Sequence, residues 1–169
     1  PCFIYPFNLV KKNRNADVTA YFFNPNIHPY DEFIKRLESV KKYCKDENIN
    51  SVIYDSYEPN KYVEKVEKNL SKRCCKCYEM RLHETAEYAL KNKFEYFSTS
   101  LLVSPYQKHE FIKETGERIG KELGVNFYYE DFRIGYINGR HKAKEYGLYM
   151  QKYCGCFYSK LEKRIKKKN

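Results

Sequence analysis

The stretch Val18–Cys44, VTAYFFNPNIHPYDEFIKRLESVKKYC, decides the fold because its hydrophobic period changes part-way along. Its beginning, Val18–Phe23, is rich in aromatic and β-branched residues and is typical of a strand. After Pro29, with Asp31 as the expected cap, apolar residues recur at the spacing of one buried helix face. These residues are Phe33, Ile34, Leu37, Val40 and Cys44. We therefore expect a strand, a loop and a helix in succession, with Cys44 packed in the core.

The same alternation recurs along the rest of the chain. Further strand-like runs lie at Ser51–Tyr54, Phe94–Thr99 and Asn126–Tyr129. Segments with helical spacing lie after Pro59, from about Tyr78 to Leu90, and over Phe111–Leu123, which Gly124 ends. This order predicts one α/β domain with a mostly parallel sheet flanked by helices. The loops at the carboxyl ends of its strands would form the ligand crevice.

The composition fits a single globular domain with an anionic partner. The 169 residues are 42% hydrophobic, and 32 Lys and Arg stand against 22 Asp and Glu, a formal net charge of +10. This excess favours nucleic acid, although a general Lys bias that aids solubility predicts the same balance. Residues 159–169 form a basic tail. The sequence has neither a long apolar run nor a signal-peptide pattern, so we expect a cytoplasmic protein without a membrane partner.

Five of the seven cysteines fall in two tight clusters. Cys74 and Cys77 have CxxC spacing, and Cys154 and Cys156 flank Gly155 in a CxC. Each pair is close enough for both sulfurs to bind one metal ion or cluster, whereas a disulfide within CxC would be strained. Structural zinc, an iron–sulfur centre and a thiol redox relay are all compatible with this spacing.

The surroundings of the first cluster are basic. Arg73, Lys76 and Arg81 would lower the pKa of the neighbouring thiols and offset the charge of a thiolate-rich site. Cys75 is an additional thiol to which the spacing gives no role. Glycine-rich phosphate loops, GxSxG and HExxH are absent from the sequence, so the common hydrolase mechanisms have no support.

Several polar residues of the predicted loops are candidates for substrate contacts. Ser98, Thr99 and Ser104 could bind phosphate or sugar hydroxyls at a helix N-terminus, or serve as ordinary caps. His28 could donate a proton or have a structural role. Asp131, after a predicted strand, could be an oxygen ligand or a catalytic proton donor in the crevice, or cap a turn.

Five motifs, taken together and in order, resemble the QueH family over nearly the whole chain. They are Phe23–Pro29, Arg73-Cys74-x-x-Cys77 with Arg81-Leu82, Ser98–Leu101 through Ser104-Pro105, Asp131–Arg133, and Tyr146–Cys156 with its Tyr-Cys-Gly-Cys ending. No single motif is specific, but their order makes a chance resemblance improbable.

The resemblance implies a Rossmann-like (HUP-like) fold with cysteine-bearing loops at the carboxyl ends of the strands. It also implies an enzyme that reduces the epoxide of epoxyqueuosine in tRNA to queuosine, with a [4Fe–4S] cluster, an adjacent iron ion and an electron donor that the sequence does not identify. Cys74, Cys77, Cys154 and Cys156 inherit metal-ligand roles from the family motifs. We hypothesise that the single iron binds the epoxide oxygen while the cluster delivers electrons.

Cys2 matches the last cysteine of a family motif that follows an N-terminal strand. Residues 1–169 are therefore expected to form one QueH-like domain without that strand and without the first cysteine pair of the motif. Two other functions remain open: a non-catalytic RNA-binding module stabilised by zinc, and a thiol–disulfide oxidoreductase that uses Cys74 and Cys77.

Overall fold

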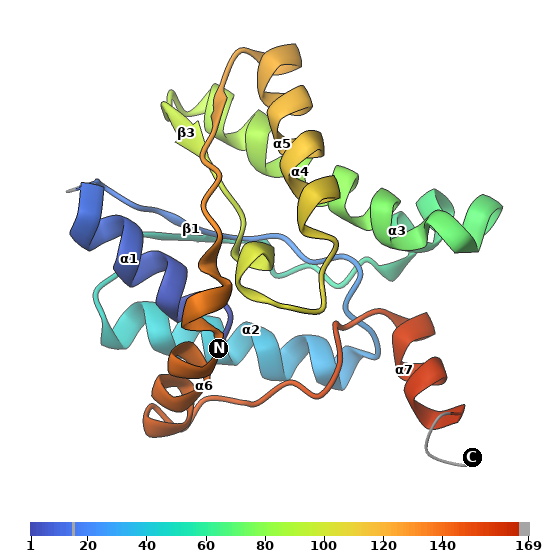
Figure 1. Cartoon of the computed structure of the whole chain (residues 1–169). Helices are drawn as coiled ribbons and strands as arrows, with labels where there is room; N and C mark the ends of the chain where they lie inside the picture. Colours follow the sequence, from blue (N-terminus) through green and yellow to red (C-terminus); the bar gives the residue numbers. More distant parts are fainter. Residues whose placement is uncertain (15, 166–169) are drawn as a thin grey trace.

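A computed structural model describes residues 1–14 and 16–165 of the chain, and helices surround its short strands (Figure 1). In chain order the elements are α1 (Ile4–Arg14), β1 (Ala20–Phe22), α2 (Tyr30–Asp46), β2 (Ser51–Ile53), α3 (Pro59–Val66), η1 (Glu67–Lys72), α4 (Arg73–Lys91), β3 (Tyr96–Phe97), η2 (Ser100–Val103), α5 (His109–Leu123), β4 (Asn126–Phe127), η3 (Phe132–Gly135), α6 (Tyr136–Glu145) and α7 (Phe157–Ile165), where η denotes a 3-10 helix. The predicted α/β class is confirmed.

All four predicted strands form, and both strand pairs are parallel. β1 pairs with β2, with Ala20 opposite Ser51, and β3 pairs with β4, with Tyr96 opposite Asn126. Helix α2 connects the first pair and α5 lies between the second, so each pair belongs to a β-α-β unit. Among the described residues the strands make two two-stranded sheets instead of the one continuous sheet expected. Each strand has only two or three residues, so the ladders are short.

Helix α2 has the buried face that its sequence predicts. Phe33, Leu37 and Cys44 are all buried, which confirms Cys44 as a core residue. The expected cap is wrong, because Pro29 occupies the N-cap position and Asp31 lies inside the first turn. There the carboxylate of Asp31 is next to the positive end of the helix dipole.

Helices α4 and α5 pack against each other and enclose the larger core. Leu82 of α4 and Ile112 and Ile119 of α5 are almost completely buried in it. Gly124 ends α5 in the left-handed conformation with φ +76°, as its sequence position predicts. Helix α4 begins at Arg73 instead of near Tyr78, which places the first cysteine pair on a helix and not in a loop.

The two ends of the chain contribute helices that the hydrophobic pattern did not indicate. Helix α1 packs against α6, and α7 follows the second cysteine pair. Seven residues of the expected basic tail, 159–165, belong to α7, and residues 166–169 lie outside the described part. In the described part of the chain, every helix is too short or too polar to cross a membrane.

Candidate functional site

One cavity of about 220 Å³ brings all five predicted metal ligands together. Its lining includes Cys2, Cys74, Cys77, Cys154 and Cys156. They come from three segments: the N-terminal residues before α1, the beginning of α4 and the segment before α7. The segments that follow β1 and β3 also line the cavity, so its position at the carboxyl ends of these strands agrees with the predicted crevice.

The two cysteines of α4 are positioned by the helix itself. Cys74 and Cys77 are three residues apart in its first turns, so their side chains share one face. Cys77 is buried, and Cys74 is half-buried. The intervening Cys75 does not belong to the cavity lining. Helical spacing therefore separates the two candidate ligands from the extra thiol.

The second cysteine pair depends on the glycine between its members. The sulfurs of Cys154 and Cys156 are 3.8 Å apart. Gly155 has φ +120°, a conformation that side chains disfavour, and a Cβ atom at this position would lie 3.0 Å from Nη1 of Arg36 and 3.1 Å from Cγ1 of Ile27. Both the backbone conformation and the crowding favour glycine here.

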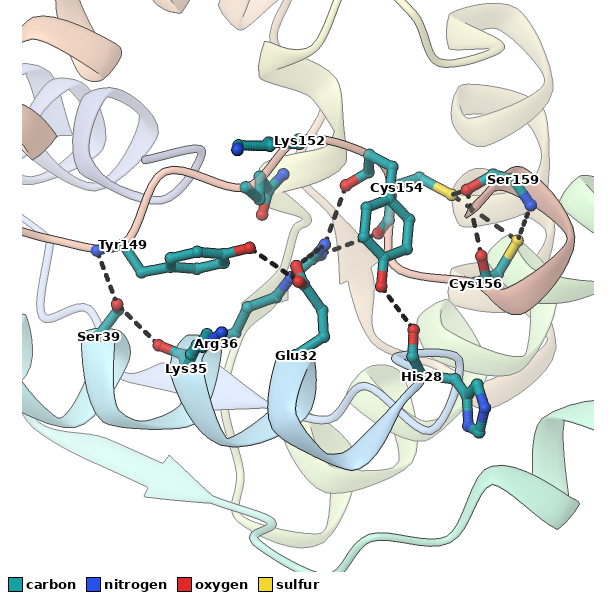
Figure 2. A network of polar contacts seen from close by, with 12 residues as sticks. His28, Glu32, Lys35, Arg36, Ser39, Tyr149, Lys152, Cys154, Cys156 and Ser159 are labelled. Atoms are coloured by element: carbon teal, nitrogen blue, oxygen red, sulfur yellow. Dashed lines mark hydrogen bonds and ion pairs between the residues drawn. The ribbon is translucent and has the colours of Figure 1, made fainter. Parts of the chain in front are cut away.

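Helix α2 holds the second cysteine pair through a buried arginine (Figure 2). Arg36 donates hydrogen bonds of 2.9 Å to the carbonyl oxygens of Tyr153 and Cys154. Glu32 pairs with the same guanidinium at 2.7 Å and accepts a hydrogen bond of 2.8 Å from the hydroxyl of Tyr149. Arg36 and Glu32 expose only 10% and 9% of their side chains. Two charges on one helix thus fix a segment that lies far away in the sequence.

His28 adds a second attachment for this segment. Its backbone N–H donates to the carbonyl of Gly155 at 2.9 Å, and its carbonyl accepts a 2.6 Å hydrogen bond from the hydroxyl of Tyr153. The imidazole contacts the hydroxyl of Tyr57 and does not belong to the cavity lining. These contacts correspond to the structural alternative for His28, and its substrate contact stays a prediction.

Burial dominates the electrostatics of the α4 cysteines. It raises the pKa of the Cys77 thiol to about 11, although Arg81 acts in the opposite direction. It also raises the pKa of Cys74, which Arg73 only partly offsets. The expectation that nearby cations would lower these pKa values was wrong, because desolvation of the thiolate is the larger effect.

Cys156 behaves differently because its sulfur accepts hydrogen bonds. The thiol of Cys154 and the backbone N–H of Ser159, at 3.3 Å, lower the pKa of Cys156 below the usual value of a thiol. Ser159 lies in the first turn of α7, so the sulfur of Cys156 caps that helix. The pKa of Cys154 moves upward in return, since it supplies the shared proton. The shared proton is therefore held on Cys154, which favours the thiolate form of Cys156.

Comparisons with known proteins agree with this arrangement. The family model described as Epoxyqueuosine reductase QueH matches residues 1–162. The chain belongs to the QueH family. It is 41% identical to Epoxyqueuosine reductase QueH of Dehalococcoides mccartyi over 162 residues, 96% of this chain and 88% of the relative. The protein of the same name in Thermotoga maritima is 41% identical over 160 residues, 89% of this chain and 83% of the relative.

A third relative extends the similarity to a more divergent sequence. Epoxyqueuosine reductase QueH of Staphylococcus aureus is 31% identical over 179 aligned positions, which cover 98% of this chain and 74% of the relative. These names confirm the predicted family and its class, an oxidoreductase of queuosine biosynthesis.

The donor chemistry of this QueH family member suits an iron–sulfur group. Five thiols face one cavity, and thiolates are the ligands that such clusters take. Arg81 lies beside Cys77, and its Nε atom is buried without a hydrogen-bond partner, so it can offset thiolate charge. Among residues 1–14 and 16–165, no three His, Cys, Asp or Glu side chains are close enough to hold one metal ion together. Ligation of a cluster spreads the thiolates over several irons and needs a wider arrangement than ligation of a single ion.

The serines and threonine predicted for substrate contact divide into two groups. Ser104 is buried at the cavity wall with Gln107. Ser98 donates to the carbonyl of Tyr128 at 2.8 Å, and Thr99 caps η2 by accepting from the N–H of Leu101 at 3.2 Å. Neither Ser98 nor Thr99 lines the cavity. Thr99 shows the capping alternative, whereas the Ser98 hydroxyl connects to the segment after β4, and substrate contacts by Ser98, Thr99 and Ser104 stay predictions.

Asp131 also lies away from the cysteines. Its carboxylate caps η3 by accepting from the N–H of Arg133 at 3.1 Å and forms an exposed ion pair with the Arg133 guanidinium. Hydrogen bonds from Arg133 lower the pKa of Asp131 to about 2, so it is ionised at neutral pH. The structure shows the turn cap that the sequence offered as an alternative, and a catalytic role for Asp131 stays a prediction.

Several cavity residues were not identified from the sequence. The sequence indicates Tyr62 only as an apolar position of a helix face, yet its buried ring lines the cavity. Burial, together with the neighbouring Cys156, raises the pKa of Tyr62. Tyr78 donates to Gln107 at 2.8 Å, and Gln151 contacts the sulfur of Cys2 at 3.6 Å. Gln151 lies within a family motif, which was the available signal, whereas Tyr62 had none.

Proposed function

We propose that the chain is an epoxyqueuosine reductase, which converts epoxyqueuosine in tRNA to queuosine by removing the epoxide oxygen. The observation that carries this proposal is the convergence of five cysteines on one cavity in a member of the QueH family. We further propose that these cysteines hold a [4Fe–4S] cluster and an adjacent iron ion. The 32 Lys and Arg of the chain suit a polyanionic substrate.

The reaction breaks both carbon–oxygen bonds of the epoxide and forms a carbon–carbon double bond. It consumes two electrons and two protons and releases the oxygen as water. When bound, the cluster and iron would supply the electrons and a Lewis acid for the departing oxygen. The electrons must come from a separate donor. We propose a cytoplasmic location, where reducing conditions suit both the thiolates and such a donor.

The chain's own residues have binding and positioning roles. Cys74 and Cys77 approach from the rigid α4, while Cys154 and Cys156 approach from the segment that Arg36 holds. Ser104, Gln107 and Gln151 give the cavity hydroxyl and amide groups that can bind the polar substituents of a modified base. Burial raises the pKa of Tyr62 and Tyr78, which keeps both hydroxyls protonated.

Metal analysis of the anaerobically purified full chain tests the proposal. Iron and acid-labile sulfide, with broad absorption near ~400 nm, are expected. Incubation with epoxyqueuosine-containing tRNA and a chemical reductant should then yield queuosine. Stoichiometric zinc without sulfide would overturn the reductase and favour the zinc-stabilised RNA-binding module, in which the four thiolates of Cys74, Cys77, Cys154 and Cys156 hold zinc. Activity of metal-free protein would favour the thiol–disulfide oxidoreductase instead.

The domain organisation belongs to the same proposal. The family match spans residues 1–162, which supports one QueH-like domain over 1–169 with a basic segment from residue 159 onward. Ser159 contacts both cysteines of the second pair, so this segment starts at the metal site.

A further inference from the structure

A second, wider depression opens beside the cysteine cavity. This outer groove has a volume of about 770 Å³, within the usual range of ligand sites. The residues that line both spaces are Pro1, Cys2, Ser104, Gln107, Gln151 and Cys154. Because the lining is shared, a ligand in the outer groove would lie directly at the entrance of the cysteine cavity.

The charge of the outer groove has one sign. Arg140, Lys152 and Lys163 line it, and none of the described residues in its lining is an aspartate or a glutamate. Lys163 lies on α7 and donates to the carbonyl of Lys152, which holds its ammonium group at the groove. The groove therefore favours an anion.

The groove also has an exposed aromatic ring. Tyr106 exposes 81% of its surface, more than any other aromatic residue among the exposed large hydrophobics. Its ring meets that of Tyr136 edge-on, with centroids 6.1 Å apart at 81°, and the Arg140 guanidinium lies 5.7 Å from the Tyr136 centroid. The Tyr106 backbone N–H donates to the hydroxyl of Ser104 at 3.4 Å. The backbone of Tyr106 is thus fixed while its side-chain ring is exposed to water, and such a ring can stack on a flat group.

Cations next to an open aromatic ring are the combination by which proteins bind unpaired nucleotides. Phosphates pair with Lys and Arg, and bases stack on aromatic rings. An acidic protein, such as an electron donor, could use the same charges. The groove shares its wall with the cavity proposed to take the modified base, and the nucleotides next to that base must lie beside it, so the position of the groove favours RNA as the occupant.

We propose that the outer groove binds the nucleotides that flank the modified base of the tRNA, while the modified base itself enters the cysteine cavity. Tyr106 stacks on a neighbouring base, and Arg140 and Lys163 contact the phosphates. This inference rests on the proposed function, since it takes the epoxide-bearing nucleotide as the group that reaches the cysteines.

Equilibrium binding of an unmodified RNA hairpin with the anticodon-loop sequence tests the groove without requiring catalysis. Fluorescence anisotropy should show Kd rising about 5- to 150-fold for Tyr106→Ala, because a stacked base is worth roughly 1–3 kcal/mol. Tyr106→Phe keeps the ring and should restore binding to within about twofold. Arg140→Gln should weaken binding and reduce the slope of log K against log salt concentration by about 0.7.

Two control variants separate the groove from general surface effects. Tyr96→Ala removes another exposed tyrosine, and Lys121→Gln removes an exposed cation of α5, and neither residue lines the groove. Both should leave Kd within about twofold of the unaltered chain. If Tyr106→Ala and Arg140→Gln behave like these controls, the inference is overturned.

The same variants distinguish failure of the groove from failure of the proposed function. If RNA binding depends on Tyr106 but the chain never reduces epoxyqueuosine, the proposed reductase function is rejected and the proposed RNA binding in the outer groove stands. Full reductase activity with unchanged kcat/KM in Tyr106→Ala would reject the groove and keep the reductase. A third outcome concerns the electron donor. Arg140→Gln could lose activity with a protein electron donor while RNA binding and turnover with a chemical reductant stay unchanged. This result would identify an acidic protein as the occupant and reject RNA.

Discussion

The guanidinium of Arg36 donates a 2.9 Å hydrogen bond to the carbonyl oxygen of Cys154, although the two residues are 118 positions apart in the sequence. Arg36 also pairs with Glu32 on its own helix. A single buried side chain therefore connects α2 to the segment that carries two candidate metal ligands.

Removal of this side chain should destabilise both the fold and the metal site. Arg36→Met leaves Glu32 as an uncompensated buried charge, which costs about 3–5 kcal/mol of unfolding free energy. Urea denaturation measures this loss, and iron per chain should fall as well. Arg118→Met removes an arginine that exposes 48% of its side chain and pairs with Glu122, so it should cost less than about 1 kcal/mol. Equal losses in the two variants would show that Arg36 has no special role.

Gly155 should not tolerate alanine. Gly155→Ala places a Cβ against Arg36 and Ile27 and forces a side chain into φ +120°, so we expect a loss of about 1–3 kcal/mol and a lower iron content. Gly147→Ala is the matched control: Gly147 has φ +63°, with no atom within 4 Å of the added Cβ. It should cost about 1 kcal/mol and leave the iron content unchanged. The prediction fails if both variants bind iron equally.

The cysteines of α4 should differ sharply in their effect on metal binding. Cys77→Ser replaces a buried sulfur of the cavity and should reduce both iron content and reductase activity at least tenfold. Cys75→Ser changes a neighbouring thiol outside the cavity lining and should keep both within about twofold. Iron and sulfide analysis with tRNA turnover makes the comparison. A similar loss in Cys75→Ser would assign that thiol to the metal site.

Asp131 should contribute to stability in a pH-dependent way. Its pKa is about 2 in the folded chain, below the usual 3.8, so the stabilisation is present above about pH 4 and is lost as the pH falls towards 2. Asp131→Asn keeps a capping oxygen and removes the charge, and since the Arg133 pair is exposed it should cost less than about 1 kcal/mol at pH 7. The difference between the two chains should vanish near pH 2.

Activity measurements on the same Asp131 variant test the catalytic prediction. Asp131 is outside the cavity lining, so Asp131→Asn should retain kcat within about twofold. A decrease of a hundredfold or more, with unchanged iron content, would instead establish Asp131 as a catalytic residue.

The sequence predicted those parts of the fold and site that depend on local pattern. Alternating strand-like and helix-like segments identified the α/β class, and the two cysteine clusters identified most of the site. The start of α4 was missed because Cys74 and Cys77 were interpreted as metal ligands and were not counted as positions of a helix face. With Tyr78 and Leu82 they do follow helical spacing, and the structure extends the helix back to Arg73.

Long-range contacts could not be predicted in this way. Arg36 occupies a polar position of α2, where local periodicity indicates only a solvated side chain, and its partners lie on a distant segment. The pKa values of Cys74 and Cys77 moved opposite to expectation, because neighbouring charges are visible in a sequence but burial is not. The contacts of Arg36 and the direction of the cysteine pKa shifts both depend on three-dimensional surroundings that local sequence does not contain.

Helix α4 carries Cys74 and Cys77 at one end and core residues such as Leu82 and Ala86 along the turns that follow. Folding of the hydrophobic core therefore places these two thiols before any metal arrives. An incoming iron group would meet these two thiols on a helix that the core already holds, and Cys154 and Cys156 on a segment that Arg36 and His28 already hold. The protein can thus fold first and be loaded afterwards, unlike small zinc domains whose cores depend on their metal.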